Sequence, residues 1–158
     1  MTKKSTKRKK KIRENERYEI EIEDWEVYYH FGVNIGRNEF ISGNFWEISS
    51  ITLLGKIVSP TLKAAPKAKI EISEKPDLDD HWKQKPTKNL SSGVGLMEIP
   101  RGHDTLHLYC WIPSRSFIYL PIAASSGKIR HVSIYGEKLK WRRGRIFYIS
   151  ATTNREEE

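Results

Sequence analysis

The sequence lacks the features that mark secreted and membrane-spanning proteins. Cys110 is the only cysteine, so no disulfide can form within the chain, and a reducing, intracellular setting is the simpler interpretation. No stretch approaches the roughly 18 consecutive apolar residues of a membrane span. Charged residues follow the basic start, where a signal peptide would have an apolar core. We therefore expect an intracellular protein, cytoplasmic or, in a eukaryotic host, nuclear, without membrane attachment.

A helical pattern of apolar residues is also missing. From Tyr18 onward, apolar and polar residues alternate, as Tyr18, Ile20 and Ile22 do with three glutamates. About ten such segments follow one another: RYEIEIE, WEVYYHF, NFWEISSITLLGKIV (one strand or two), KAKIEIS, GVGLMEI, DTLHLYCWI, SFIYLPI, KIRHVSIYG, EKLKW and RIFYISA. A chain of 158 residues with this pattern predicts a single all-β domain, an antiparallel β-sandwich or a barrel-like fold.

Composition divides the chain into three parts. Residues 1–16 are rich in Lys and Arg and have no hydrophobic period, which predicts a disordered basic arm. Residues 17–153 form the all-β domain, interrupted at 74–93 by a polar, Pro-containing segment that predicts a long mobile loop. Residues 154–158 form an acidic C-terminal tail.

The arm carries the whole excess of positive charge. The formal net charge is +8, and residues 1–13 hold eight cations and no acid. These cations are Lys3, Lys4, Lys7, Arg8, Lys9, Lys10, Lys11 and Arg13. Taking these 8 from the 28 Lys and Arg residues leaves 20 basic residues against 20 acidic ones. A flexible polycation of this kind predicts sequence-independent contact with nucleic-acid phosphates, and the alternative is a tail that only keeps the protein soluble.

Charge is also segregated within the neutral domain. Residues 14–26 are mostly acidic and residues 128–145 mostly basic. The two blocks either pair with each other inside the fold or face partners.

The stretch KLKWRRGRIFY predicts a β-hairpin with a basic tip. Arg142, Arg143 and Gly144 would form the tip, and Gly144 would supply the positive φ of a three-residue loop. Trp141 and Arg145 flank this tip. Arginines beside an aromatic ring can bind phosphate and stack on a base, so Trp141, Arg142, Arg143 and Arg145 are a second candidate nucleic-acid contact. The alternative is an ordinary solvated hairpin tip.

The stretch RGHDTLHLYCWIP, residues 101–113, suggests a metal or catalytic site at first sight. In an extended strand, however, His103 and His107 would lie about 13 Å apart, too far to share one metal ion. Cys110 has the parity of Leu106 and Leu108, which predicts a buried, inert thiol. We expect no metal site, no cofactor and no catalytic residue.

Residues 105–122 predict a second hairpin that is apolar on both faces. One face is aliphatic, and the other carries the aromatic residues His107, Tyr109, Trp111, Phe117 and Tyr119. Because so many exposed rings would lower solubility, we expect this aromatic face to be covered. The cover is either another part of the chain or a partner, which would be another protein or a second copy.

These patterns favour a non-enzymatic binding or scaffold protein associated with nucleic acid. Two alternatives stay open. A carbohydrate-binding β-sandwich would use Tyr109, Trp111 and Tyr119 as a stacking platform for sugars. A hydrolase would need histidines and acids from separate strands to converge in one pocket.

Overall fold

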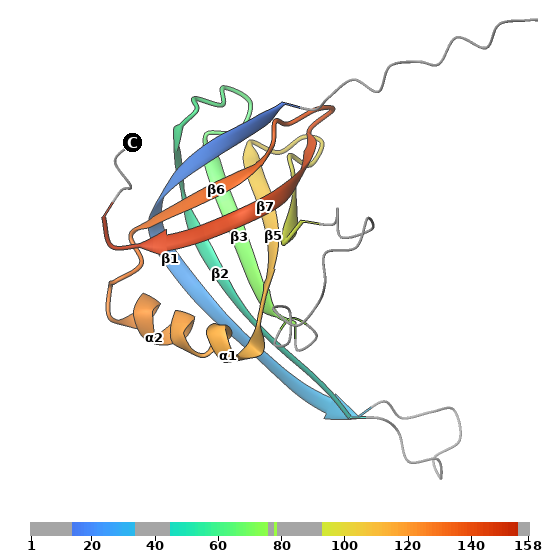
Figure 1. Cartoon of the computed structure of the whole chain (residues 1–158), viewed down its shortest axis with the longest axis vertical. Coiled ribbons are helices and arrows are strands. Elements are labelled where there is room, and N and C mark those ends of the chain that lie inside the picture. The colour runs from blue at the N-terminus through green and yellow to red at the C-terminus, as the bar shows by residue number, and fades with distance from the viewer. Residues whose placement is uncertain (1–13, 34–44, 76–77, 79–92, 155–158) are drawn as a thin grey trace, which may run out of the picture.

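Seven strands and two short helices make up the part of the chain that the structure describes, which in this computed structural model is residues 14–33, 45–75, 78 and 93–154 (Figure 1). The strands are β1 (Asn15–Val33), β2 (Phe45–Ser59), β3 (Lys67–Glu74), β4 (Gly95–Glu98), β5 (Thr105–Ile112), β6 (His131–Glu137) and β7 (Arg143–Thr152). The helices are α1 (Ser114–Phe117) and α2 (Tyr119–Ser125). The prediction of an all-β, barrel-like fold is confirmed, and the expected number of about ten strands is wrong.

The strands close into one barrel in the order β1-β2-β3-β5-β4-β7-β6. The long strand β1 closes it, because its first residues pair with β6 while the rest of the strand pairs with β2. Strands β3 and β5 run parallel, and all other neighbours are antiparallel. Beyond the barrel, β1 and β2 continue as a two-stranded ribbon, and both helices lie at that same end (Figure 1).

Three differences explain the lower strand number. RYEIEIE and WEVYYHF form one continuous strand, β1, and EKLKW is a turn with a single bridge between Lys140 and Arg143. SFIYLPI is helical, so the predicted 105–122 hairpin does not exist. Its apolar residues Phe117, Leu120 and Ala124 follow helical spacing and pack on the core. This tertiary packing overrides the strand propensity of the isolated segment.

The core confirms the alternation read from the sequence. Along β5, Leu106, Leu108 and Cys110 point into the barrel and are buried, while the residues between them are partly exposed. Burial raises the pKa of the Cys110 thiol to about 12, so the reactive thiolate is disfavoured at neutral pH. Burial of the cysteine was predicted and is confirmed.

Several predictions fall on residues that are not described. The basic residues at 1–13, nearly all of the 74–93 loop and residues 155–158 lie outside the described ranges. Strand β1 begins at Asn15, inside the segment 1–16 that the sequence assigned to the arm. Within the described ranges, no helix is both long enough and apolar enough to cross a membrane.

Candidate functional site

The β6–β7 hairpin ends in a two-residue turn that displays Trp141. Lys140 and Arg143 exchange both backbone hydrogen bonds, at 3.0 and 3.1 Å, with Trp141 and Arg142 between them. Both turn residues have positive φ, 54° and 69°, as type I′ hairpin turns require. Of the Trp141 side chain 88% is exposed. The hairpin is confirmed, but its tip lies one residue earlier than predicted.

Gly144 therefore does not form the turn. It is buried within β7, where an added Cβ would lie 2.8 Å from both the carbonyl oxygen of Glu137 and the terminal methyl of Met97. The glycine is needed for this close approach of strands and not for a positive φ.

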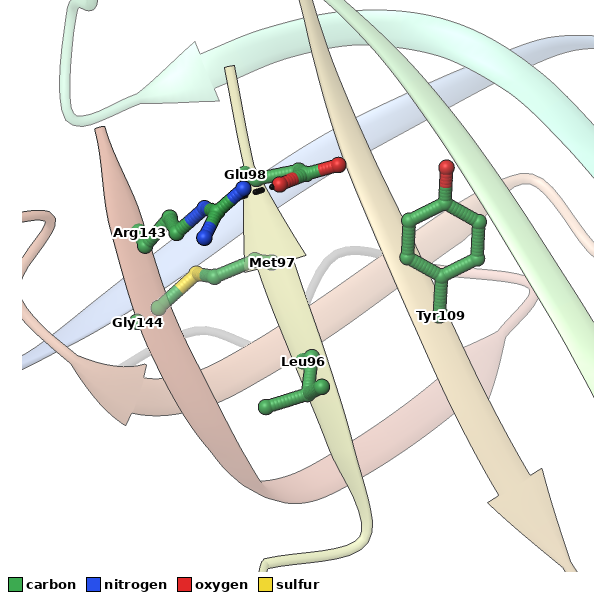
Figure 2. Close-up of a pocket in the computed structure, with 6 residues that line it drawn as sticks. All are labelled: Leu96, Met97, Glu98, Tyr109, Arg143 and Gly144. Atoms are coloured by element: carbon green, nitrogen blue, oxygen red, sulfur yellow. Dashed lines mark hydrogen bonds and ion pairs between the residues drawn. The ribbon is translucent and has the colours of Figure 1, made fainter. Parts of the chain in front are cut away.

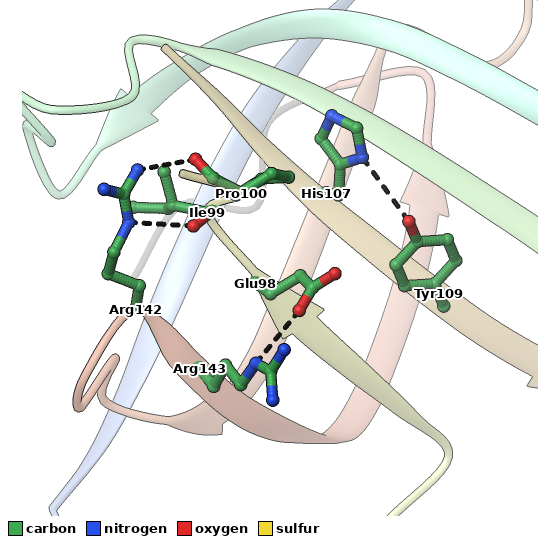
Figure 3. A network of polar contacts seen from close by, with 7 residues as sticks. All are labelled: Glu98, Ile99, Pro100, His107, Tyr109, Arg142 and Arg143. Carbon is green, nitrogen blue, oxygen red and sulfur yellow. Dashed lines mark hydrogen bonds and ion pairs between the residues drawn. The ribbon is translucent and has the colours of Figure 1, made fainter. Parts of the chain in front are cut away.

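Arg142 is bound to the backbone of its own chain. Its Nε donates to the carbonyl of Ile99 at 2.8 Å, and its Nη2 donates to the carbonyl of Pro100 at 2.7 Å (Figure 3). The Ile99 amide in turn donates to the Arg142 carbonyl at 2.8 Å. These three hydrogen bonds fix the hairpin tip to the end of β4. The guanidinium of Arg142 therefore stabilises the turn.

Arg145 forms an ion pair with the buried carboxylate of Glu137. Its Nη2 and Nε lie 2.7 and 3.0 Å from Oε1, and its backbone amide donates to Oε2 at 3.1 Å. The hydrogen bond to this carboxylate, more than the charge itself, raises the pKa of Arg145. Only 3% of the Glu137 side chain is exposed, so the arginine compensates a charge that would otherwise be costly to bury.

Arg143 is the arginine of the predicted set that pairs with an acid at the barrel surface. Its side chain is 79% exposed and its Nε lies 3.0 Å from Oε2 of Glu98. The two residues border a cleft of about 300 Å³ on the outer surface of the barrel (Figure 2). The cleft is lined by Leu96, Met97, Glu98, Tyr109, Arg143 and Gly144. A surface ion pair of this kind is weak, so a phosphate can compete for the guanidinium.

The five predicted aromatic residues do not share one surface. His107, Tyr109 and Trp111 are partly buried on the outer face of β5, whereas Phe117 is the buried residue of α1. Tyr119 lies on α2 and is 69% exposed. Of the two covers expected for these residues, cover within the monomer does not apply to Tyr119, and cover by a partner stays a prediction. The three-ring sugar platform also does not form on one strand, because Tyr119 belongs to a helix.

Two cations lie over aromatic rings on the outer face of β5 and β7. Lys75 Nζ lies 5.8 Å from the ring centre of Trp111, and the guanidinium of Arg145 lies 5.6 Å from that of Phe147. In the register of β4 and β5, Leu96 stands opposite Tyr109 beside Arg145. Leu96, Glu98 and Phe147 are not among the predicted site residues, although their alternation within short strands indicates an outward face.

His103 and His107 are closer than an extended strand allows. Their ring centres lie 6.1 Å apart, because residues 100–103 form a turn that ends in a hydrogen bond from the His103 amide to Pro100. The separation of about 13 Å inferred from strand geometry is wrong for that reason. No group of three or more metal-binding side chains gathers among the residues that the structure describes.

The surroundings of His107 give a testable pH dependence. Its pKa is lowered by partial burial and then by Lys69 and His103, against the opposing charges of Glu98 and Glu71. The unfolded chain therefore binds a proton more readily, and stability present above the ordinary histidine pKa of about 6.5 is lost as the pH falls. We expect the free energy of unfolding to fall between about pH 7.5 and 5.5, and to fall less in His107→Gln. Urea unfolding of both proteins at the two pH values measures this, and an equal fall in both would contradict it.

Glu14, the first described residue, is bonded to the β6–β7 hairpin. The Lys138 amide donates to the Glu14 carbonyl at 2.8 Å, and Lys138 Nζ lies 3.4 Å from Oε2 of Glu14. This ion pair joins the acidic and basic blocks that the sequence separates. Residue 14 is thus held at the base of the hairpin that carries Trp141 and Arg143.

Comparison with known proteins finds no relative of this chain. No family model matches the chain, and neither a curated protein nor a solved structure shows significant similarity to it. A function is therefore inferred from the contacts and charges of the site alone.

Proposed function

We propose that the protein is a non-enzymatic binding or scaffold protein that associates with nucleic acid. The supporting observation is the position of Glu14, which is hydrogen-bonded to Lys138 at the base of the β6–β7 hairpin. The described chain thus begins at the base of the hairpin that carries the exposed Trp141 and Arg143, and the eight cations of residues 1–13 precede Glu14 in the sequence. Glu14 directly follows one candidate phosphate contact in the sequence and is bonded to the base of the other.

The neighbouring barrel surface extends this contact. The cleft beside Arg143 has Leu96 and Tyr109 in its wall, which offers an apolar surface next to a cation. Further along the same face, the cation of Lys75 lies over the ring of Trp111. Surfaces that bind nucleic-acid strands combine cations for the backbone with rings for the bases, and this face has both.

The structure changes the expected roles of the arginines. Arg142 and Arg145 were both candidates for phosphate binding, yet Arg142 holds the turn and Arg145 neutralises Glu137. Arg143 remains the residue of the hairpin that we assign to phosphate.

A charge-matched pair of variants tests the proposal. Arg143→Ala removes the cation at the hairpin, and Lys128→Ala removes an exposed cation between α2 and β6 at the opposite end of the barrel. We expect Arg143→Ala to reduce the salt dependence of binding, the slope of log K against log salt, by about 0.7 to 0.9, and Lys128→Ala to leave it unchanged.

Fluorescence anisotropy of a labelled oligonucleotide, titrated with full-length protein at several salt concentrations, gives these slopes. If the two variants reduced the salt slope equally, binding would depend on the net charge of the protein and not on the hairpin site. Failure of the full chain to bind single-stranded or duplex nucleic acid at low salt would refute the proposed function.

A further inference from the structure

The conformation of the hairpin tip is unusual for its residues. Type I′ turns favour Asn, Asp and Gly at both central positions, because these residues adopt positive φ at little cost. Here the two positions hold Trp141 and Arg142, at φ 54° and 69°. A bulky side chain in this region is strained, and such strain persists only where the surrounding structure enforces it.

The anchor of Arg142 enforces this conformation. Its guanidinium donates to two successive carbonyls, those of Ile99 and Pro100, and its own carbonyl accepts from Ile99. The side chain and the backbone of Arg142 thus both hold the tip against the end of β4 (Figure 3). The neighbouring residue, Trp141, receives no packing in return and projects with 88% of its surface exposed.

We infer that Trp141 is a base-stacking residue that favours unpaired bases, and that Arg142 is the positioning residue that holds it outward. This inference rests on the proposed association with nucleic acid and specifies the form that binds best. An indole at the apex of a tight turn can stack only on a base whose face is open, and the base faces of a continuous duplex are covered by neighbouring pairs. Arg143, the next residue along the chain, is placed for the adjoining phosphate.

The choice of residues supports a role in binding over a role in folding. An exposed tryptophan adds nothing to the core, and asparagine or glycine would suit the turn better. A large exposed aromatic side chain in a strained turn lowers the stability of the fold. Such a cost fits a residue, here Trp141, whose role is contact with a ligand. The cleft at Leu96 and Tyr109 lies next to the tip and can take the neighbouring base.

The test compares one single-stranded oligodeoxynucleotide with its duplex, using wild type, Trp141→Asn, Trp141→Phe and Arg142→Lys. In Trp141→Asn we expect the affinity for the single strand to fall about 5- to 150-fold, the range for loss of one stacked base, with the duplex affinity changed less than about twofold. Trp141→Phe should recover much of the loss because it keeps a ring. The melting temperature of Trp141→Asn should equal or exceed that of wild type, so that lost binding is not lost folding.

Arg142→Lys tests the positioning role. Lysine keeps the charge but cannot donate to both carbonyls in the fixed geometry of a guanidinium. We expect the ratio of single-strand to duplex affinity to fall while the salt slope stays that of wild type. If Arg142 had only a structural or only an electrostatic role, Arg142→Lys would not change the ratio of single-strand to duplex affinity while leaving the salt slope unchanged.

Distinct outcomes separate the two proposals. Binding of wild type to neither form refutes the association with nucleic acid itself. In a second case, the wild type binds while Trp141→Asn either loses the same affinity for single strand and duplex or keeps the wild-type affinity for both. Each of these results overturns the stacking role and leaves the association with nucleic acid standing. An unchanged affinity ratio in Arg142→Lys overturns the positioning role.

Discussion

Raising the salt concentration from about 50 to 200 mM is expected to weaken binding of nucleic acid by about 10³- to 10⁵-fold, the loss typical of 6 to 10 phosphate contacts. The eight cations of residues 1–13 and Arg143 supply a number of contacts in this range. Each neutralised phosphate releases condensed counterions, and added salt opposes that release. Because the arm holds most of these cations, it should account for most of the salt dependence.

A variant of unchanged length isolates the contribution of the arm. Changing its seven cations between residues 2 and 11 to glutamine keeps the segment and removes its charge. If all seven hold phosphates, the slope of log K against log salt should fall in magnitude by about 5 to 6. Anisotropy titrations of variant and wild type over one salt series measure the two slopes, with Lys128→Ala as the control for a single distant charge. Tight binding that does not respond to salt would contradict the phosphate model for the arm.

Replacing Arg145 with leucine is expected to lower the free energy of unfolding by about 3 to 5 kcal/mol at pH 7. The reason is the carboxylate of Glu137, which is 3% exposed and would stay buried without its cation. Removing the cation that pairs with a buried carboxylate costs more than the pair contributes, since the remaining charge has lost its solvent and its counter-charge. Urea unfolding followed by tryptophan fluorescence measures the change.

Two further measurements connect that loss to Glu137. In Arg145→Leu the buried carboxylate can relieve its cost by taking up a proton, so the deficit should be smaller at about pH 4.5 than at pH 7. The double variant Arg145→Leu, Glu137→Leu removes both charges and should recover most of the stability. A deficit that is independent of pH and unchanged in the double variant would assign the loss to packing of the arginine side chain.

Local alternation made part of the fold predictable. Leu106, Leu108 and Cys110 were placed on one face from their parity, and all three lie inside the barrel. This inference succeeds because a strand points successive residues to opposite sides whatever its partners are. Closure of the barrel, by contrast, depends on pairing between β1 and β6, which no local pattern reveals.

Other features depended on contacts that are distant in sequence. The segment Ser116–Ile122 has the composition of a strand, but Phe117 and Leu120 gain more by packing on the core as helix residues. His103 was placed on an extended strand, and a turn beginning at Pro100 brings it back toward His107. In both cases tertiary structure overrides a local preference, and the local preference is all that the sequence alone displays.

The candidate site was predicted in its residue types and not in its roles. A run of arginines beside a tryptophan indicates phosphate binding, but the partner of each arginine is fixed by the fold. Arg143 faces Glu98 from β4, Arg145 faces Glu137 across the hairpin, and Arg142 reaches carbonyls at the end of β4. None of these pairings follows a spacing rule, which is why the sequence indicates the residue types of this surface and not the partner of each arginine.

The pairing of β1 with β6 also sets the order in which the chain can fold. The first strand leaves its edge at Asn15–Glu21 open until His131–Glu137 arrives, long after β1 itself has been synthesised. Contacts this distant in sequence make folding slow, and an open strand edge can pair with other chains in the meantime. A nascent chain stalled before residue 131 would therefore present the unpaired edge of its first strand to other chains until the last strands close the barrel.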